Sequence, residues 1–315
     1  MWPNARIVAH LTPIPALAPN SSGLSLDEAN RKISELILSG KPSLVARFSK
    51  GELEAVLRFH RARHWKVGRR VGWAIANLEI ATWKPGDYQN MKTPLGYFRA
   101  ITEDVISKFY DVTVSSAEEI DLMGSWVPGE NQLSALCKVP NLTGLEQLWP
   151  FFAEEPWTGS LAGKKVLVVH PFAETIHRQF AKRENLHKRD GLLPNFDLMT
   201  VKPPWKVLQQ SDLDTDSDYE WFDLLDELIQ KCRGMEFDVA IIGAGAYGLP
   251  LGADIKKSGK TALVVGSLTQ LLFGIQGGRW ERNSDFLPIV TDSWSRPSSE
   301  ETPAESPQIE NSAYW

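Results

Sequence analysis

The fold is decided by residues 238–267, which read DVAIIGAGAYGLPLGADIKKSGKTALVVGS. An apolar, β-branched run leads into a Gly-x-Gly-x-x-Gly turn between Gly243 and Gly248. An amphipathic segment follows and stops at Gly259, and a second apolar run covers Thr261 to Val265. This order predicts a strand, a glycine turn, a helix and a second strand, which together make one βαβ unit.

The glycine turn is typical of an anion-binding site, because glycines allow close approach and a helix N-terminus offers unpaired N–H groups. A dinucleotide fold also expects an acidic residue about 20 residues after the glycines, to hold a ribose hydroxyl. The second strand instead ends in Gly266-Ser267, and Tyr247 would crowd a pyrophosphate. We therefore expect neither NAD nor FAD. A sugar nucleotide, another ligand and a purely structural turn remain alternatives.

The composition indicates a globular protein without a nucleic-acid partner and without a transmembrane segment. Of the 315 residues, 43% are hydrophobic and 23% are charged, and the net charge of −5 gives no footprint for nucleic acid. No apolar run reaches the ~18 residues that a transmembrane segment needs. Cys137 and Cys232 form no metal or redox motif, so a cytoplasmic location is the simplest expectation. The 12 Trp residues could stack on sugars or bases but more often pack, and those in polar, Pro-rich contexts include Trp83, Trp126, Trp157, Trp205 and Trp294.

Strands and helices alternate along most of the chain. We expect residues 1–24 to be irregular. Residues 25–294 should form a single α/β domain with two halves, of about 25–160 and 161–294. Residues 295–315 should form a Pro/Ser/Glu-rich tail without regular structure. The alternation predicts a Rossmann-like open, mainly parallel sheet with helices on both faces.

The pattern predicts further elements outside the βαβ unit. Ser25 begins a helix that Gly40 ends. The other expected strands cover residues 43–48, 112–115, 164–170 and 196–201. The other expected helices cover residues 52–60, 71–80, 95–109, 174–183 and 221–232. A loop is expected at residues 124–129.

Four strand ends carry polar or glycine residues. They are Arg47 to Glu52, His170 to Thr175, Gly243 to Tyr247, and Gly266 to Gln270. Because the carboxyl ends of parallel strands meet at one edge of a sheet, we expect these groups to surround one cleft.

Each candidate also has a structural interpretation. Glu52 suits a base or a metal ligand, but an acid also stabilises the N-terminus of its own helix. Arg47 could bind a diphosphate or form an ion pair. His170 could act in a functional site or be a hydrogen-bonded histidine of the core. Arg279 could bind an anion or pack on Trp280 by a cation–π contact.

Several longer motifs then resemble a known family. The segments Val168 to Ile176, Gly243 to Leu251, Gln270 to Ile275, Gly278 to Trp280 and Trp294 to Trp315 resemble bacterial proteins assigned to the GT-D glycosyltransferase fold. This resemblance covers about residues 43–315. It implies glycosyl transfer from a nucleotide sugar, with a UDP-sugar as the favoured donor and a glycan or lipid-linked acceptor. A non-catalytic nucleotide-sugar-binding or scaffold protein and a Rossmann oxidoreductase are the alternatives.

The chain departs from that family at one position. Relatives carry Arg-Phe-Gly-Asp-Gly-Glu after the first strand, and the two acids are held to serve a metal–diphosphate site. Here the segment reads Arg47-Phe48-Ser49-Lys50-Gly51-Glu52, so a lysine replaces an acid. The resemblance implies Mn²⁺ or Mg²⁺ bound through Glu52, whereas Lys50 could neutralise the diphosphate in place of the ion. Expected catalytic residues are Glu52 and His170. Expected substrate-binding residues are Arg47, Lys50, Gly51, Thr175, Gly243, Gly245, Tyr247, Gly248, Gln270 and Arg279.

Overall fold

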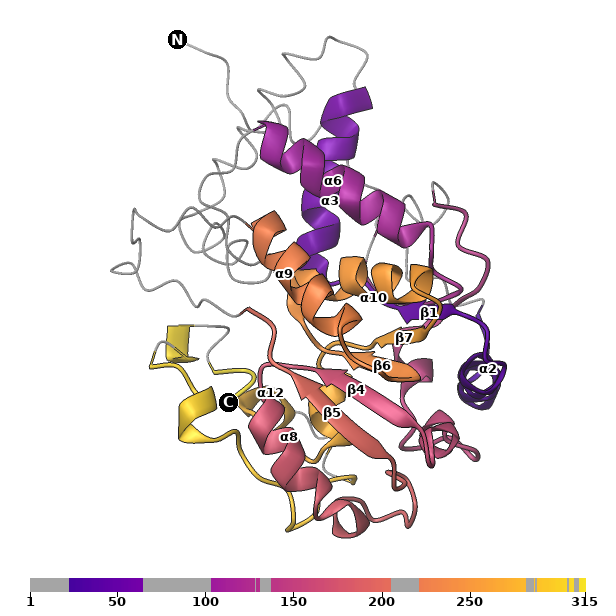
Figure 1. The fold of residues 1–315 in the computed structure, drawn as a ribbon, viewed down its shortest axis with the longest axis vertical. Helices are drawn as coiled ribbons and strands as arrows, with labels where there is room; N and C mark the ends of the chain where they lie inside the picture. The colour runs from indigo at the N-terminus through magenta and orange to yellow at the C-terminus, as the bar shows by residue number, and fades with distance from the viewer. Residues whose placement is uncertain are drawn as a thin grey trace.

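Seven parallel strands form one continuous sheet at the centre of the molecule (Figure 1). The structure is a computed structural model, and it describes residues 23–64, 103–127, 129–130, 137–204, 221–281, 286, 288–304, 306–308 and 312–315. The strands are β1 Ser43–Ala46, β2 Leu122–Ser125, β3 Leu142–Gly144, β4 Lys165–Val169, β5 Asp197–Val201, β6 Val239–Ile242 and β7 Thr261–Val264. Their order across the sheet is β3-β2-β1-β7-β6-β4-β5.

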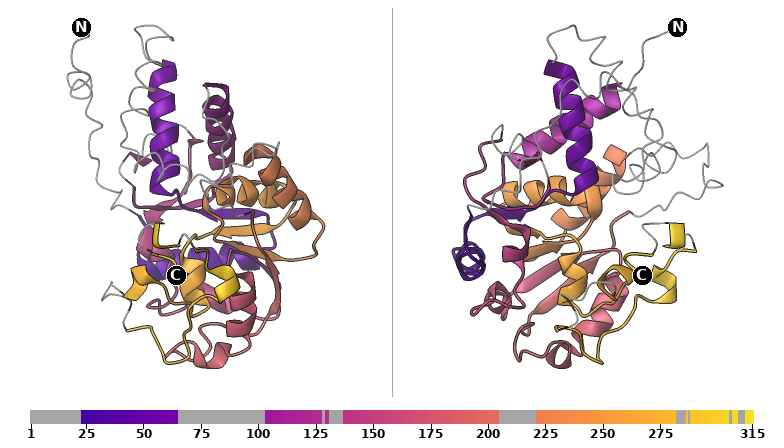
Figure 2. Two further views of the ribbon diagram at one scale, coloured as in Figure 1. Left: turned by 90° about the vertical axis from the view of Figure 1, so that its left-hand side faces the viewer. Right: turned by 180° about the vertical axis from the view of Figure 1, so that it is seen from behind.

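Helices cover both faces of this sheet (Figures 1 and 2). One face carries α3 Lys50–His64, α6 Glu103–Ala117, α9 Trp221–Arg233 and α10 Gly248–Lys257, and the other carries α2 Leu26–Leu38, α8 Ala173–Phe180, α11 Leu268–Leu272 and α12 Gly278–Glu281. The expectation of an α/β fold with an open parallel sheet is therefore confirmed. Among the described residues, no helix has the length and hydropathy of a membrane span.

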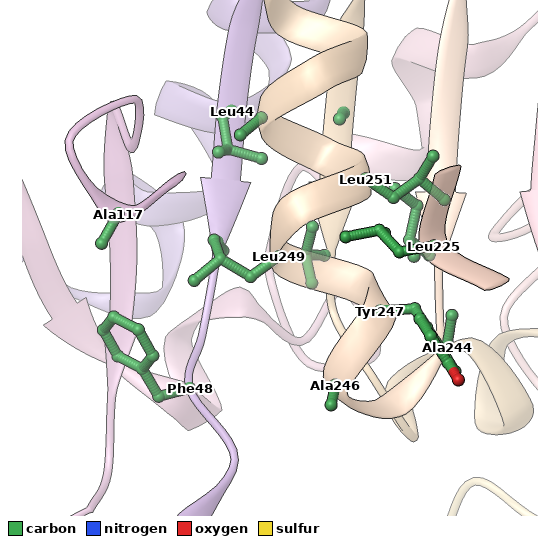
Figure 3. Packing of buried hydrophobic residues seen from close by; sticks show 14 of the residues in the cluster. Leu44, Phe48, Ala117, Leu225, Ala244, Ala246, Tyr247, Leu249 and Leu251 are labelled. Carbon is green, nitrogen blue, oxygen red and sulfur yellow. The ribbon is translucent and has the colours of Figure 1, made fainter. Parts of the chain in front are cut away.

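Each face of the sheet has its own hydrophobic core. Leu44 and Ala46 of β1 belong to one core, whereas Val45 between them belongs to the other. Both faces of these strands are buried, which is why they read as unbroken apolar runs. Figure 3 shows helix α10 between strand β1, which carries Leu44, and Leu225 of α9, with Leu251 of α10 beside Leu225, and all three leucines belong to the first core.

Local sequence signals explain several boundaries. The Ser25 hydroxyl accepts the Glu28 N–H, and the Glu28 carboxylate accepts the Ser25 N–H at 2.9 Å, so the capping box at the start of α2 is complete. Gly40 follows α2 with a φ of +66°. The βαβ unit also forms as expected, with β6 and β7 paired in parallel from Val239 and Thr261 onward.

Two expected elements are wrong. Residues 112–115 lie inside helix α6, where Thr113 Oγ1 donates to the Phe109 carbonyl oxygen at 2.8 Å. A β-branched run can form a helix when its apolar side packs on neighbours, and α6 packs on α3 and α10. The expected loop at 124–129 begins instead as strand β2. Gly124 lets the 3₁₀-helix η1 Leu145–Leu148 approach, since a Cβ there would lie 2.5 Å from Leu148 Cδ1.

Other expectations fall partly outside the described residues. The helix expected at 71–80 lies outside them, and so do the first eight residues of the one expected at 95–109. The C-terminal segment differs from the expectation of a tail without regular structure. It contains the 3₁₀-helices η6 Ser299–Glu301 and η7 Ser306–Gln308 and buries the Trp315 side chain.

Candidate functional site

The candidate site lies at the carboxyl edge of four adjacent strands. In sheet order, β1 leads to Arg47, β7 to Gly266, β6 to Gly243, and β4 to His170. All four strands are parallel, so these residues lie at the same edge. Figure 3 shows Phe48 beyond the arrowhead of β1.

Two glycines bring these strand ends into direct contact. A Cβ built on Gly243 would lie 2.6 Å from His170 Cδ2 and 2.7 Å from the Gly266 carbonyl oxygen. Gly266 has a φ of +60°, and a Cβ there would overlap the Arg47 guanidinium. The imidazole, the two glycine backbones and the guanidinium therefore form one contiguous row, which larger side chains would break. Thr269 Oγ1 lies beside Gly243, is buried and has no hydrogen-bond partner.

Arg47 keeps much of its bonding capacity. Its Nη1 donates to the Phe48 carbonyl oxygen at 3.3 Å, and in the described part of the chain no carboxylate lies within ion-pair distance. Its charge is nevertheless felt by two buried acids, Glu52 and Glu130. A half-buried guanidinium with spare donors suits an anionic ligand.

Glu52 occupies the first turn of α3, and its side chain is 6% exposed. Burial raises the pKa of Glu52, and the Arg47 charge and the hydrogen bonds of Ser49 oppose that shift only in part. Its Oε1 has no hydrogen-bond partner. A carboxyl group with a raised pKa and an unpartnered oxygen fits a proton-transfer role.

Glu130 is a buried acid that the sequence analysis missed. It follows β2, and its carboxylate accepts hydrogen bonds from Ser125 Oγ and from the Trp126 backbone N–H. Burial raises the pKa of Glu130, while these bonds and Arg47 lower it. The signal was an acidic residue a few positions after an apolar strand, as at Glu52, but the expected loop at 124–129 concealed the end of that strand.

His170 is neutral in this setting. Its ring is 5% exposed, and its Nδ1 accepts the Phe172 backbone N–H at 3.0 Å, which leaves the proton on Nε2. Burial lowers the pKa of His170 to about 3. The imidazole can therefore donate a hydrogen bond through Nε2, but it is a weak base.

The glycine turn has a tightly packed geometry. Gly245 has a φ of +54° in a 3₁₀ turn, and Gly248 begins α10, where a Cβ would lie 3.1 Å from Val264 Cγ1. The Tyr247 ring is buried and stacks on Trp221, with centroids 5.2 Å apart and an interplanar angle of 11°. Tyr247 thus packs in the core at the start of α10 (Figure 3).

Three further candidates contact the C-terminal segment. Thr175 donates to the Glu301 carboxylate through its N–H and its hydroxyl. Gln270 is fully buried, and its Nε2 donates to the Tyr314 carbonyl oxygen at 2.8 Å. The Arg279 guanidinium lies 4.8 Å from the centroid of the Tyr314 ring, and 5.9 Å from that of Trp280. These contacts give all three residues a structural role.

Lys50 and Gly51 lie in the first turn of α3, at the same edge as Arg47. The Lys50 side chain is 69% exposed, and its Nζ lies 4.0 Å from Glu54 Oε1. This contact directs the lysine along the outer surface of α3.

Comparisons with known proteins bear only on the overall architecture. Neither the protein-family models nor the curated proteins give a match. Among solved structures, the chain is similar to a domain of unknown function 1792 described as having a distinct glycosyltransferase fold, with 13% identity, a TM-score of 0.43 and coverage of 89% of this chain and 92% of that chain. It is also similar to a selenomethionine-substituted structure of that domain, with 12% identity, a TM-score of 0.39 and 79% coverage of each chain. These values are too low to assign a reaction.

Proposed function

We propose that the protein is a glycosyltransferase that takes its sugar from a nucleoside-diphosphate sugar. A UDP-sugar is the first candidate donor, and a glycan or a lipid-linked saccharide is the acceptor. The observation that carries the proposal is the row formed by Arg47, Gly266, Gly243 and His170 at one sheet edge, together with the buried Glu52, which feels the Arg47 charge. A departing diphosphate needs a cation and hydrogen-bond donors, and an acceptor hydroxyl needs a base.

The geometry supports distinct roles for three residues. The acceptor oxygen attacks the sugar C1, the bond from C1 to the diphosphate oxygen breaks, and the acceptor proton passes to the Glu52 carboxylate. Because burial raises the pKa of Glu52, its carboxylate is a stronger base than an exposed one. Arg47 meets the charge that develops on the diphosphate. Neutral His170 donates from Nε2 to the donor substrate and positions it.

The described residues do not fit a divalent ion held by protein side chains alone. In the described part of the chain, no group of three or more His, Cys, Asp or Glu side chains is placed so that it could hold a metal ion. The positive charge of Arg47 acts on both Glu52 and Glu130, which disfavours a second cation between them. We therefore propose that Arg47 supplies the charge that a metal would otherwise supply.

We also propose that the protein acts in the cytoplasm. The two cysteines, Cys137 and Cys232, are buried and unpaired. Burial raises the pKa of each thiol to about 11, so both persist as unreactive thiols.

A ligand-binding screen tests the proposed donor. Calorimetry with UDP, GDP, UDP-glucose, UDP-N-acetylglucosamine, NAD and NADP is done with EDTA and again with Mn²⁺. We expect a nucleoside diphosphate or its sugar to bind more tightly than NAD or NADP, in both conditions. Tight binding of NAD or NADP without binding of UDP or GDP compounds would refute a sugar-nucleotide function.

An activity assay separates a transferase from a protein that only binds. Release of UDP or GDP is measured with each nucleotide sugar in the presence of mixed oligosaccharide acceptors. Binding without any release, with EDTA or with Mn²⁺, would favour a non-catalytic nucleotide-sugar-binding protein.

A further inference from the structure

Trp126 exposes an aromatic ring at the candidate site. The described residues expose three large apolar side chains, which are Leu38, Phe152 and Trp126. Leu38 ends helix α2, and Phe152 lies in the loop between η1 and the 3₁₀-helix η2 Trp157–Leu161. Only Trp126, which is 39% exposed, directly follows a strand at the carboxyl edge. The exposed part of this ring offers an apolar, aromatic surface on which a ligand can stack.

The Trp126 ring is held in a fixed orientation. Its Nε1 donates to the Phe48 carbonyl oxygen at 2.7 Å, which ties the indole to the end of β1. Its backbone N–H donates to Glu130 Oε2 at 2.8 Å, and Ser125 Oγ donates to the same carboxylate. Glu130 is only 2% exposed, so its hydrogen bonds to Ser125 and to the Trp126 backbone are shielded from water. A ligand that stacks on a pre-oriented ring loses less entropy than one that must order it.

The surroundings of Trp126 are polar and continuous with the candidate site. The Phe48 carbonyl oxygen that accepts the indole N–H also accepts the Arg47 guanidinium. Glu130, which accepts the Trp126 backbone N–H, and Glu52, which feels the Arg47 charge, each have a buried Oε1 without a hydrogen-bond partner. An aromatic face beside carboxyl and guanidinium groups suits a ligand that has an apolar C–H face and a rim of hydroxyl groups. A pyranose ring has both.

We propose that Trp126 is the stacking platform of a sugar subsite, with Glu130 as the residue that positions it. The ligand is a pyranose ring, belonging either to the donor or to the acceptor. This inference rests on the proposed function, because it assigns a further part of the same edge, but sugar binding can be measured without transfer. Glu130 acts through the backbone of Trp126 and does not need to touch the sugar.

The test compares two substitutions that both remove the indole N–H. Trp126→Phe keeps an aromatic face, whereas Trp126→Leu keeps only apolar bulk. Phe152→Ala is the control for loss of an exposed aromatic ring away from this edge. Thermal melting checks that each variant is folded. Calorimetry measures binding of UDP-glucose, UDP-N-acetylglucosamine and UDP, and a glycan array measures binding of saccharides without a nucleotide.

We expect Trp126→Leu to weaken sugar binding by about tenfold and Trp126→Phe to weaken it by less than about threefold. Loss confined to nucleotide sugars assigns the subsite to the donor, and loss confined to array glycans assigns it to the acceptor. If Trp126→Leu weakens binding of UDP, which carries no sugar, as much as it weakens binding of the nucleotide sugars, the ring stacks on the base. If Trp126→Leu leaves binding of every ligand unchanged, the ring is not part of the site. Either result overturns the sugar subsite.

The same data keep the two proposals separate. If the wild type binds UDP compounds and Trp126→Leu binds both UDP compounds and array glycans with unchanged affinity, the proposed function is retained and the subsite is lost. Wild-type protein that binds array glycans through Trp126 but no nucleotide retains the subsite and loses the proposed donor. Wild-type protein that binds neither class of ligand refutes both.

Discussion

Glu52 is buried, feels the charge of Arg47 and has one carboxylate oxygen unpartnered, which is unfavourable for stability and favourable for proton transfer. We expect Glu52→Gln to lower transfer by at least about a hundredfold. Release of the nucleotide measures this effect. The matched control is Glu54→Gln on the same helix, whose side chain is 35% exposed and pairs with Lys50. Activity of Glu52→Gln within about tenfold of wild type would show that another group takes the proton.

The same substitution has a predictable pH dependence. The folded-state pKa of Glu52 is raised, so just above the unfolded-state value of 4.5 the native protein holds a proton that the unfolded chain has lost. The contribution of Glu52 to stability therefore falls as pH rises through that window. Glutamine does not titrate. We expect Glu52→Gln to gain stability relative to wild type between pH 4.5 and pH 8, measured from urea midpoints, whereas a constant difference across this range would contradict the raised pKa.

His170 predicts a pH dependence of the opposite sign. Its pKa is lowered from 6.5 to about 3, so between these values the native protein binds fewer protons than the unfolded chain. The contribution of His170 to the free energy of unfolding is therefore fully present above about pH 6.5 and is lost as the pH falls toward 3. His170→Asn retains an acceptor for the Phe172 N–H and cannot become charged. We expect the variant to lose less stability than wild type between pH 7 and pH 4, and an equal loss would show that His170 is protonated in the native state.

At the scale of single elements, the loop after β7 holds the Arg47 side chain through a glycine. We expect Gly266→Ala and Gly163→Ala each to lose about 1 kcal/mol of stability, because both glycines have positive φ. A Cβ at Gly163 meets nothing within 4 Å, whereas one at Gly266 overlaps the Arg47 guanidinium. Only Gly266→Ala should also weaken UDP binding, by about tenfold. If the two variants bind UDP with equal affinity, Arg47 does not contact the diphosphate.

The sequence predicted some elements well and missed others for a physical reason. The unit from β6 to β7 was predicted to within two residues, because its strands, turn and helix are each defined locally. Strand β2 was missed because Gly124 suggests a turn, although it is required by the close packing of Leu148. The error at β2 also hid Glu130. The stacking of Tyr247 on Trp221 joins residues far apart in sequence, and no local pattern reveals such a contact.

The C-terminal segment acts as a strap across the N-terminus of α8. The Glu301 carboxylate accepts the backbone N–H groups of Glu174 and Thr175, and the Glu301 carbonyl oxygen accepts Trp315 Nε1 at 2.9 Å. We expect Glu301→Ala to lower the free energy of unfolding by about 2 kcal/mol, because it leaves buried donors unpaired. The exposed neighbour Glu300 provides the control, and chemical denaturation is the measurement. Similar losses for Glu300→Ala and Glu301→Ala would mean that this contact does not hold the strap.

At the scale of the whole molecule, the two halves of the sequence share one sheet. Strand β1 pairs with β7 over four residues, from Ser43 with Thr261 to Ala46 with Val264, and this pairing joins β1–β3 to β4–β7. The cores also cross the division, since Leu44 lies against Gly252 of α10. Neither half can bury its apolar surface alone, so the described α/β unit should unfold as one cooperative structure.

This sharing predicts one calorimetric transition, with a van't Hoff enthalpy close to the calorimetric enthalpy. Leu44→Ala removes a fully buried side chain at the junction of the halves and should lower the free energy of unfolding by about 3 kcal/mol. Circular dichroism in the far and near ultraviolet should report the same shifted midpoint. Leu38→Ala is the control, because that side chain is 65% exposed and should change stability by less than about 0.5 kcal/mol. If Leu44→Ala instead splits the melting curve into two transitions and shifts only one of them, the halves fold separately and a site shared across β1 and β4 would depend on their docking.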